Sequence, residues 1–399
     1  MDDASPPAPG HSGAFRSLAP AVHRGATVVF GSMAEYGTRR DRFYDGYSYG
    51  LYGTPTSREL ERRIAMLEGA ARSFVVPSGM AAITLVTLAC AAAGGHVLFP
   101  DSAYDPVRSL AATLLVPLGV EVGFYDPLVR HDMAGLITPS TRLVWVESPG
   151  SVTMEVQDLP AIAEAARLHG VRVAADSTWA TPLRLRALEH GADFAVNAVS
   201  KYLNGHSDVL MGAVSVRDEG LYRRLRDMAR ALGHGVSPED CALVMRGLET
   251  LELRLDRAEA TGLRLARWLA ARPEVAEVRH PALPSCPGHA AWRRDFTGAS
   301  GVFSVVLQPW TRPRLPAVVE ALRHFAIGAS WGATRSLVAP IDPAPPRTAV
   351  PWTASGPILR FSAGLEDAAT LEADLAQAFA LFGSAPRSPV PFVREESNT

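Results

Sequence analysis

Seven short apolar runs divide the first 216 residues of the chain. The run at 193–199 is mostly apolar, which is typical of a strand buried on both faces of a parallel sheet. Most of the runs are separated by segments with helical spacing of apolar residues. The runs lie at 73–77, 95–100, 120–125, 142–148, 171–176, 193–199 and 212–216. This alternation predicts an α/β fold with a mainly parallel seven-stranded sheet.

The segment 56–70, ahead of the first run, has the pattern of an amphipathic helix. Thr56, with a glutamate three residues later, predicts a capping box at the start of this helix, and Gly69 can end it. Leu60, Ile64 and Leu67 recur at helical spacing and predict the face that packs on the sheet.

The pattern changes in the last third of the chain. A long helical pattern at 248–271 can join the large domain to a smaller one. Beyond it, we expect helices near residue 315 and after Leu365, and strands from the apolar runs at 275–283, 301–307 and 358–365. The sequence therefore predicts a C-terminal α+β domain.

Five segments follow from these patterns. Proline and polar residues dominate both ends of the chain, which predicts flexible terminal arms. The predicted segments are an N-terminal arm at 1–20, an N-terminal segment at 21–55, a large domain at 56–250, a small C-terminal domain at 251–384 and a tail at 385–399.

Composition narrows the class of protein. A chain of 399 residues, 47% of them hydrophobic, is long enough for two domains. Its 39 Lys and Arg residues and 41 Asp and Glu residues are dispersed, so neither nucleic acid nor a membrane is an expected partner. Cys90, Cys241 and Cys286 have neither metal-ligand spacing nor a disulfide framework, so no metal site is expected. With no signal peptide pattern at the N-terminus, we expect a cytoplasmic protein that binds a small molecule.

Lys201 follows the apolar run 193–199, which places it at the carboxyl edge of the predicted sheet. Most lysines are solvated surface residues. A lysine at a buried edge, however, can lose its proton more easily and form a Schiff base with a carbonyl compound. Asp176 ends another strand 25 positions earlier. The two residues are either a structural ion pair or part of a pyridoxal phosphate site, in which an aspartate bonds the pyridine nitrogen.

Other strand ends offer what such a site needs. Ser78 and Gly79 begin a predicted helix, whose free amides favour phosphate, although most such turns only connect elements. Tyr104 can stack on the pyridine ring or be an ordinary loop tyrosine. Ser200 offers a hydroxyl to the phosphate, and Arg360 is either a bidentate carboxylate ligand or a solvated strand residue.

Eight stretches, in this order, resemble the Cys/Met metabolism family of pyridoxal phosphate-dependent enzymes. They cover 47–70, 78–83, 103–106, 145–156, 175–182, 200–208, 280–307 and 330–337, and include "SGMAAI", "WVESPGSVTMEV", "ADSTWATP" and "SKYLNGHSD". The resemblance extends over about residues 20 to 382. Within the family it is strongest to the cystathionine β-lyase branch.

This resemblance implies an aspartate aminotransferase-type fold, also called fold type I, and pyridoxal 5'-phosphate as the cofactor. It also implies a homotetramer, a dimer of dimers, in which residues 21–55 complete the active site of a neighbouring chain. The implied catalytic residues are Lys201, Tyr104 and Tyr49. The implied cofactor-binding residues are Lys201, Asp176, Tyr104, Ser78, Gly79, Met80, Ser200, Thr178 and Tyr49. Arg360, Ser330 and Trp331 are the implied substrate-binding residues.

One position departs from the family pattern. Two residues after the tyrosine at 49, members of the family usually have an arginine that binds the phosphate, whereas this chain has Leu51. Losing a charge-assisted bond should weaken cofactor binding or require another cation. Arg39, Arg40 and Arg42 are close in the chain, but a solvated basic loop is the more common interpretation of such a cluster.

The implied activity is a carbon–sulfur β-lyase that cleaves the thioether L-cystathionine to homocysteine, pyruvate and ammonia. "ESPGSV" at 147–152 favours β-elimination, because γ-active members usually have "ETPTNP" there. The alternatives are a γ-lyase or γ-synthase, a lyase for another thioether amino acid, and a cofactor-binding protein without turnover. A Schiff-base aldolase on a (β/α)₈ barrel would explain the lysine but not the C-terminal domain.

Overall fold

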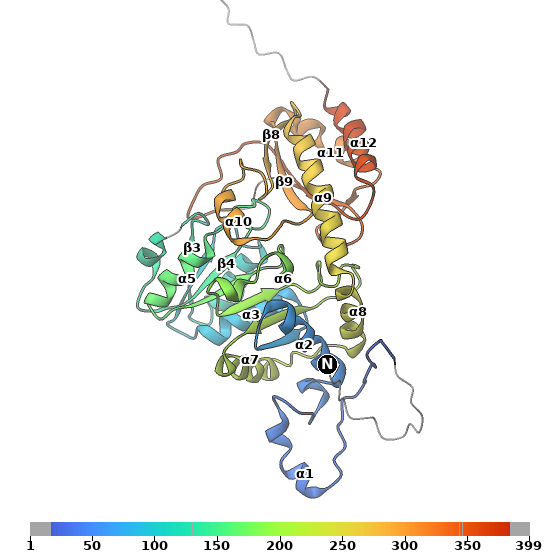
Figure 1. Ribbon diagram of the computed structural model, residues 1–399. Helices are drawn as coiled ribbons and strands as arrows, with labels where there is room; N and C mark the ends of the chain where they lie inside the picture. Colours follow the sequence, from blue (N-terminus) through green and yellow to red (C-terminus); the bar gives the residue numbers. More distant parts are fainter. Residues whose placement is uncertain (1–16, 130, 343, 345, 384–399) are drawn as a thin grey trace, which may run out of the picture.

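Two β-sheets, each covered by helices, make up the part of the chain that the computed structural model describes, residues 17–129, 131–342, 344 and 346–383 (Figure 1). The larger sheet lies in the first part of the chain and the smaller sheet in the last third. The strands of the larger sheet are β1 Arg72–Val76, β2 His96–Pro100, β3 Glu121–Tyr125, β4 Thr141–Glu147, β5 Arg172–Asp176, β6 Phe194–Asn197 and β7 Gly212–Val216.

The larger sheet has the strand order β1-β7-β6-β5-β4-β2-β3. Strands β2 to β6 run parallel, and β7 is antiparallel to both β1 and β6. The predicted mainly parallel seven-stranded sheet is therefore confirmed. In the register of β4 and β5, Glu147 lies beside Asp176, so two carboxylates meet at the carboxyl edge of the sheet.

Both faces of this sheet are buried, which explains the continuous apolar runs. Phe99 and Trp145 pack on one face with α3 Gly79–Cys90 and α7 Glu219–Ala231. Leu98 and Val144, one residue earlier on the same strands, pack on the opposite face with α5 Leu159–Leu168. Successive side chains of a strand point to opposite faces, so each face needs its own apolar set.

Helix α2, Pro55–Glu68, starts earlier than the sequence predicted. Its N-cap is Thr54, which forms the capping box with Ser57, so the assignment of Thr56 as the cap was wrong. Pro55 explains the shift, because a proline suits the first helical position, where no N–H is needed. The predicted end is confirmed, since Gly69 caps the helix in the left-handed conformation with φ 61°.

The smaller sheet has the order β10-β11-β12-β9-β8. The predicted strands β8 Val275–Arg279, β9 Val302–Leu307 and β12 Ile358–Ser362 are confirmed, as are the predicted helices α9 Leu251–Ala270, α11 Leu315–Glu320 and α12 Ala368–Phe379. The sequence analysis missed β10 Ala326–Ile327, which has two residues, and β11 Leu337–Ile341, which contains a proline. The remaining α-helices are α1 Met33–Gly37, α4 Pro106–Leu110, α6 Thr181–Arg184, α8 Pro238–Leu248 and α10 His289–Asp295.

The N-terminal segment packs little on its own chain. Helix α1 lies at the tip of a long loop that projects away from the larger sheet (Figure 1). Val29 and Met33 in this loop are 90% and 81% exposed. Most of the predicted arm at 1–20, and the predicted tail at 385–399, lie outside the described residues.

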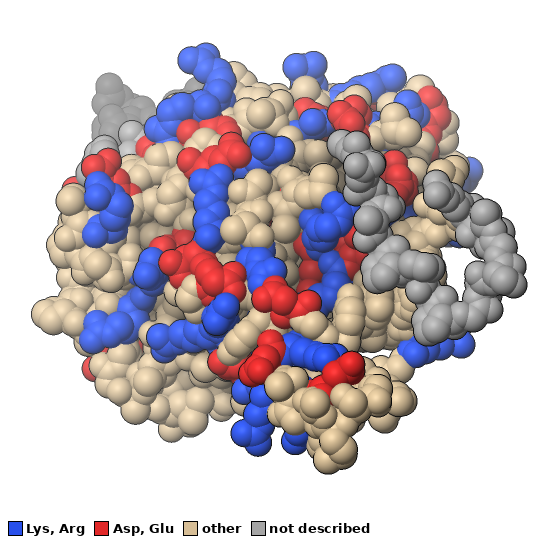
Figure 2. Space-filling model, turned by 60° about the horizontal axis from the view of Figure 1, so that its bottom comes forward, with Lys and Arg blue, Asp and Glu red and all other residues tan. Residues whose placement is uncertain are grey.

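The molecular surface carries both signs of charge. On the face drawn in Figure 2, basic and acidic side chains alternate without a continuous patch of either sign. Among the helices described, none has both the length and the apolar character that crossing a bilayer requires.

Candidate active site

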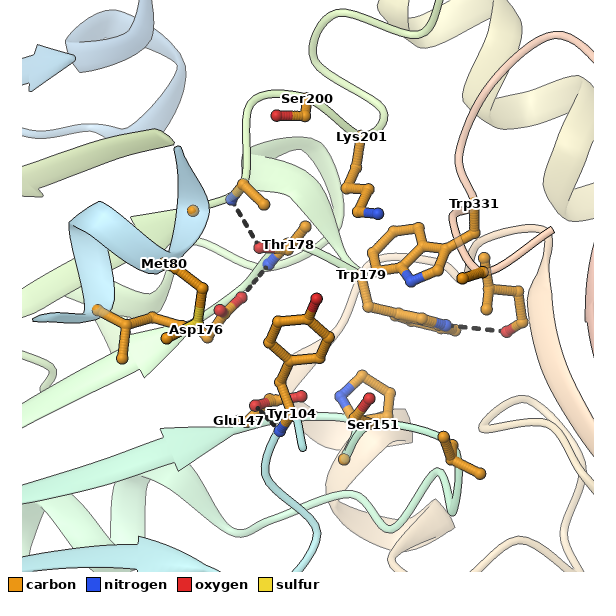
Figure 3. Close-up of a pocket in the computed structure, with 18 of the residues that line it drawn as sticks. Met80, Tyr104, Glu147, Ser151, Asp176, Thr178, Trp179, Ser200, Lys201 and Trp331 are labelled. Atoms are coloured by element: carbon orange, nitrogen blue, oxygen red, sulfur yellow. Dashed lines mark hydrogen bonds between the residues drawn. The ribbon is translucent and has the colours of Figure 1, made fainter. Parts of the chain in front are cut away.

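A cavity of about 250 Å³ opens between the carboxyl edge of the larger sheet and the smaller sheet. It is lined by residues from segments far apart in the chain (Figure 3). Ten of the predicted site residues line it: Ser78, Gly79, Met80, Tyr104, Asp176, Thr178, Ser200, Lys201, Trp331 and Arg360. Ser330 touches the end of the Lys201 side chain, whereas Tyr49 lies elsewhere.

Lys201 lies on the loop that follows β6, and its side chain points into the cavity (Figure 3). Its Nζ donates to Ser330 Oγ at 2.7 Å and lies 5.3 Å from the ring centre of Trp331. The pKa of Lys201 is lowered from 10.5 to about 8, because burial disfavours the charged amine and because the Arg360 guanidinium repels it. At neutral pH about a tenth of such amines are uncharged and able to act as a base or nucleophile.

Lys201 is also the only lysine in the sequence. The other basic residues among the 39 Lys and Arg are all arginines, which stay protonated in proteins. Arginine therefore cannot replace an amine that has to lose its proton. The presence of a single lysine in the sequence points to a chemical role for Lys201, and the sequence analysis did not use this observation.

Two carboxylates form the bottom of the cavity. Asp176 Oδ1 accepts the N–H of Thr178 at 2.9 Å, and Glu147 Oε2 accepts the N–H of Tyr104 at 2.8 Å (Figure 3). Burial raises the pKa of both carboxyls, and the neighbouring Asp176 raises that of Glu147 further. A cation beside these two carboxyls would favour their ionised form, and a protonated pyridine nitrogen fits this position. The sequence analysis missed Glu147, although this residue lies at the end of a predicted strand, as Asp176 does.

The start of α3 offers an anion site at the other side of the cavity. Ser78 caps this helix by accepting the Ala81 N–H at 3.0 Å, which leaves its own proton to donate. The N–H groups of Gly79 and Met80 belong to the first helical turn, which has no intrahelical acceptors. Gly79 is needed because a Cβ there would approach Ala198 Cβ to 2.8 Å. These donors, next to the lysine loop, fit the phosphate of pyridoxal phosphate.

Ser200 has a different geometry from the one predicted. Its Oγ donates to the Met211 carbonyl at 3.1 Å and accepts the Met211 N–H at 2.8 Å. Its proton is therefore directed at the backbone rather than at the cavity. Thr178 is similar, because its Oγ1 accepts the Ala198 N–H at 2.8 Å. Both hydroxyls tie the strand ends of the site together.

Arg360 on β12 brings a buried positive charge to the cavity, with only 9% of the residue exposed. Its Nη2 donates to the carbonyls of Ala329 at 2.5 Å and Ser330 at 3.3 Å. Within the described part of the chain it forms no ion pair, and burial lowers its pKa. A buried guanidinium held by carbonyls and without an anion is suited to binding a carboxylate.

Aromatic side chains enclose the space between these groups. Tyr104, 46% exposed, extends its ring into the middle of the cavity, and Trp331 lies across from it (Figure 3). Trp331 packs on Tyr202 with ring centres 5.8 Å apart. Trp179, which the sequence analysis did not predict, forms part of the wall, and its Nε1 donates to Val302 O at 2.9 Å.

Tyr49 and Leu51 lie outside this cavity. They line a separate surface depression together with Arg24 and Glu239, which form an ion pair. Tyr49 is 47% exposed and follows the projecting loop that carries α1. In its own chain this residue does not reach Lys201.

Comparison with known proteins identifies the class. The model of the Cys/Met metabolism PLP-dependent enzyme family matches residues 8–380, and the chain belongs to this family. Pyridoxal phosphate is the cofactor of the family, and the donor set described above fits it. The expected fold type is confirmed by the solved structure of a cystathionine gamma synthase from Xanthomonas oryzae pv. oryzae in complex with aminoacrylate and cysteine. It has a TM-score of 0.84 and 30% identity, and the match covers 92% of this chain and 94% of that one.

Individual relatives carry several names. The chain is 43% identical to a provisionally named cystathionine beta-lyase of Rhizobium johnstonii, over 90% of each chain. It is 37% identical to the cystathionine beta-lyase of Escherichia coli K12, over 90% of this chain and 92% of the relative. It is also 37% identical to an L-alanine/L-glutamate racemase of Wolbachia pipientis, over 91% of this chain and 93% of the relative.

Proposed function

We propose that this protein is a pyridoxal phosphate-dependent carbon–sulfur β-lyase that cleaves L-cystathionine to homocysteine, pyruvate and ammonia. The observation that carries the proposal is the placement of Arg360 and Lys201 in one cavity, where a buried guanidinium that has no ion pair among the described residues accompanies an amine of lowered pKa. The β-lyase names of the relatives and the "ESPGSVTMEV" wall at 147–156 support the β side of the substrate.

In this proposal the strand ends of the larger sheet hold the cofactor. Asp176 would bind the pyridine nitrogen, Tyr104 would pack on the ring, and Ser78 with the amides of Gly79 and Met80 would bind the phosphate. Bound pyridoxal phosphate supplies an aldehyde for amines and an electron sink for negative charge at the α-carbon.

The protein side chains then orient the substrate and move its protons. Arg360 binds the α-carboxylate through two N–H groups, which directs the α-hydrogen at Lys201. The neutral Nζ of Lys201 takes this proton as general base. The bond between Cβ and sulfur then breaks, and a proton from Nζ neutralises the departing thiolate to give homocysteine. Hydrolysis of the three-carbon fragment consumes one water and releases pyruvate and ammonia.

The test is to identify the keto acid that the loaded wild-type enzyme forms from cystathionine. β-Elimination gives pyruvate with homocysteine, whereas γ-elimination gives 2-oxobutyrate with cysteine. An excess of 2-oxobutyrate would reject the proposal in favour of a γ-lyase. Loss of the α-hydrogen to solvent without either keto acid would instead indicate racemisation, the activity named for the Wolbachia relative.

A γ-synthase is the second candidate, favoured by the solved structure with that name. Such an enzyme must also remove a β-proton before the γ-substituent leaves, and it uses an activated homoserine rather than cystathionine. Incubation with an activated homoserine and cysteine separates the two, because only the γ-synthase forms cystathionine.

The assembly belongs to the same proposal. A homotetramer built from dimers would bring Tyr49 of one chain to the cavity of the next, which agrees with the exposed position of Tyr49 and the projecting loop before it. We place the large domain at 56–250 and the small domain at 251–384, and we assign the enzyme to methionine biosynthesis in the cytoplasm.

A further inference from the structure

One wall of the cavity has a strained backbone. Gly150, Ser151, Val152 and Met154 all line the cavity, on the loop that follows β4. Val152 and Met154 have positive φ angles of 66° and 57°. This left-handed conformation is unfavourable for non-glycine residues, above all for a β-branched valine. Backbone strain of this kind persists only where surrounding contacts enforce it.

Two arginines of the smaller domain bind Thr153 and Glu155, which alternate along the chain with the strained residues Val152 and Met154. Arg347 Nη2 donates to Thr153 Oγ1 at 2.7 Å and to Glu155 Oε1 at 2.6 Å. Arg279 Nη1 donates to Thr153 O at 3.0 Å and to Glu155 Oε1 at 3.2 Å. Trp352 covers both guanidiniums, at 4.5 Å from Arg279 and 5.5 Å from Arg347.

The ion pairs are buried, so removing one partner leaves the other charge uncompensated. The side chains of Arg347 and Glu155 are 6% and 5% exposed. Leaving a buried charge without its partner is costly, so the contacts favour one arrangement of the wall. The segment that carries Arg347 is itself anchored, because the N–H groups of Thr348 and Val350 donate to Asp101 at the end of β2.

We propose that Arg279 and Arg347 are positioning residues for the substrate pocket. From the smaller domain, they hold the backbone of residues 150–155 in the strained conformation that places Val152 and Met154 against the bound substrate. They touch neither the cofactor site nor Lys201. They therefore affect how the side chain of the substrate fits the pocket, and this part of the inference rests on the proposed function.

The first test is hydrogen exchange of the loaded enzyme, followed by mass spectrometry of peptides covering 149–157. Arg347→Met should speed exchange of these amides by about tenfold or more, as expected for loss of a hydrogen bond to a charged group. Arg347→Lys, which keeps the charge, should restore part of the protection. Arg264→Met is the matched control, because Arg264 pairs with Glu372 on the surface of the same domain.

The second test separates strain from simple contact. Glycine adopts a positive φ without cost, so in a Val152→Gly background the Arg347→Met substitution should speed exchange clearly less. Equal acceleration in both backgrounds would overturn the role of strain. If Arg347→Met does not fold, Glu155→Gln and Arg347→Lys replace it. Unchanged exchange in all foldable variants would overturn the proposal itself.

Kinetics adds a readout that a purely structural role would not change. For cystathionine we expect Arg347→Met to raise KM more than it lowers kcat, with the visible absorption of the bound cofactor as in the wild type. An equal fall of kcat with unchanged KM would contradict a positioning role. If the wild type cleaves no thioether, the proposed function fails, while hydrogen exchange still decides the role of the arginines.

Discussion

The lowered pKa of Lys201 can be tested by removing the charge that contributes to it. The pKa of Lys201 is lowered from 10.5 to about 8, with burial as the larger cause and the charge of Arg360 as the smaller. Arg360→Gln removes only the smaller cause. Less than half of the shift should therefore be reversed, so the pKa of Lys201 in the variant should rise above about 8 but stay closer to that value than to 10.5.

The assay is competitive acetylation of the cofactor-free protein as a function of pH. Because Lys201 is the only lysine, a single peptide reports on it, and the α-amine of the chain is identified separately. In the wild type the reactivity should rise with a midpoint near pH 8. Arg264→Gln, which removes an exposed arginine far from the cavity, is the matched control and should leave the midpoint unchanged.

The sign of the shift also predicts the pH dependence of stability. Burial disfavours the charged amine, so the lowered pKa destabilises the folded cofactor-free protein below pH 8, and this cost disappears as the pH rises towards 10.5. A shift of this size corresponds to about 3 kcal/mol, which we reduce to about 1–2 kcal/mol because the amine is partly exposed. Two results would refute the reasoning. One is a wild-type acetylation midpoint near pH 10.5, and the other is an Arg360→Gln midpoint that equals the wild-type midpoint.

Three further predictions follow from the site. Lys201→Arg keeps the charge but should lower turnover at least about a hundredfold, because arginine cannot act as the base; near wild-type rates in a preparation free of other lyases would contradict this. Asp176→Asn should lower kcat about tenfold to a hundredfold, the effect of one charge-assisted bond, and unchanged exchange of the α-hydrogen would speak against the pairing. Leu51→Arg should tighten pyridoxal phosphate by about 1–3 kcal/mol in dialysis and reconstitution, whereas equal affinity would mean that another cation already serves the phosphate.

The larger sheet was predictable because its strands are buried on both faces. A run such as "LVWV" is apolar at every position, as expected for a parallel strand that helices cover on both faces. The smaller sheet was predicted less completely. Strand β10 is an edge strand of two residues that pairs with β11, and β11 contains a proline, so neither segment has the sequence pattern of a buried strand.

The sequence predicted ten of the residues that line the cavity, but not the contacts that these residues make. Lys201 and Asp176 could be placed because both follow predicted strands and match family motifs. Glu147 was missed because the sequence does not show which strands are neighbours, and the register of β4 and β5 decides its position. The contacts of Arg279 and Arg347 with residues 153–155 join segments far apart in the chain, which no local pattern records.

Borohydride reduction tests whether Lys201 holds pyridoxal phosphate. Reduction fixes the cofactor on the amine to which it is bound, and the absence of other lysines makes the assignment simple. We predict that the visible absorption band disappears and that the peptide containing Lys201 gains the mass of the reduced cofactor. A modified α-amine with an unmodified Lys201 peptide, or no modification of a fully reconstituted enzyme, would contradict the account.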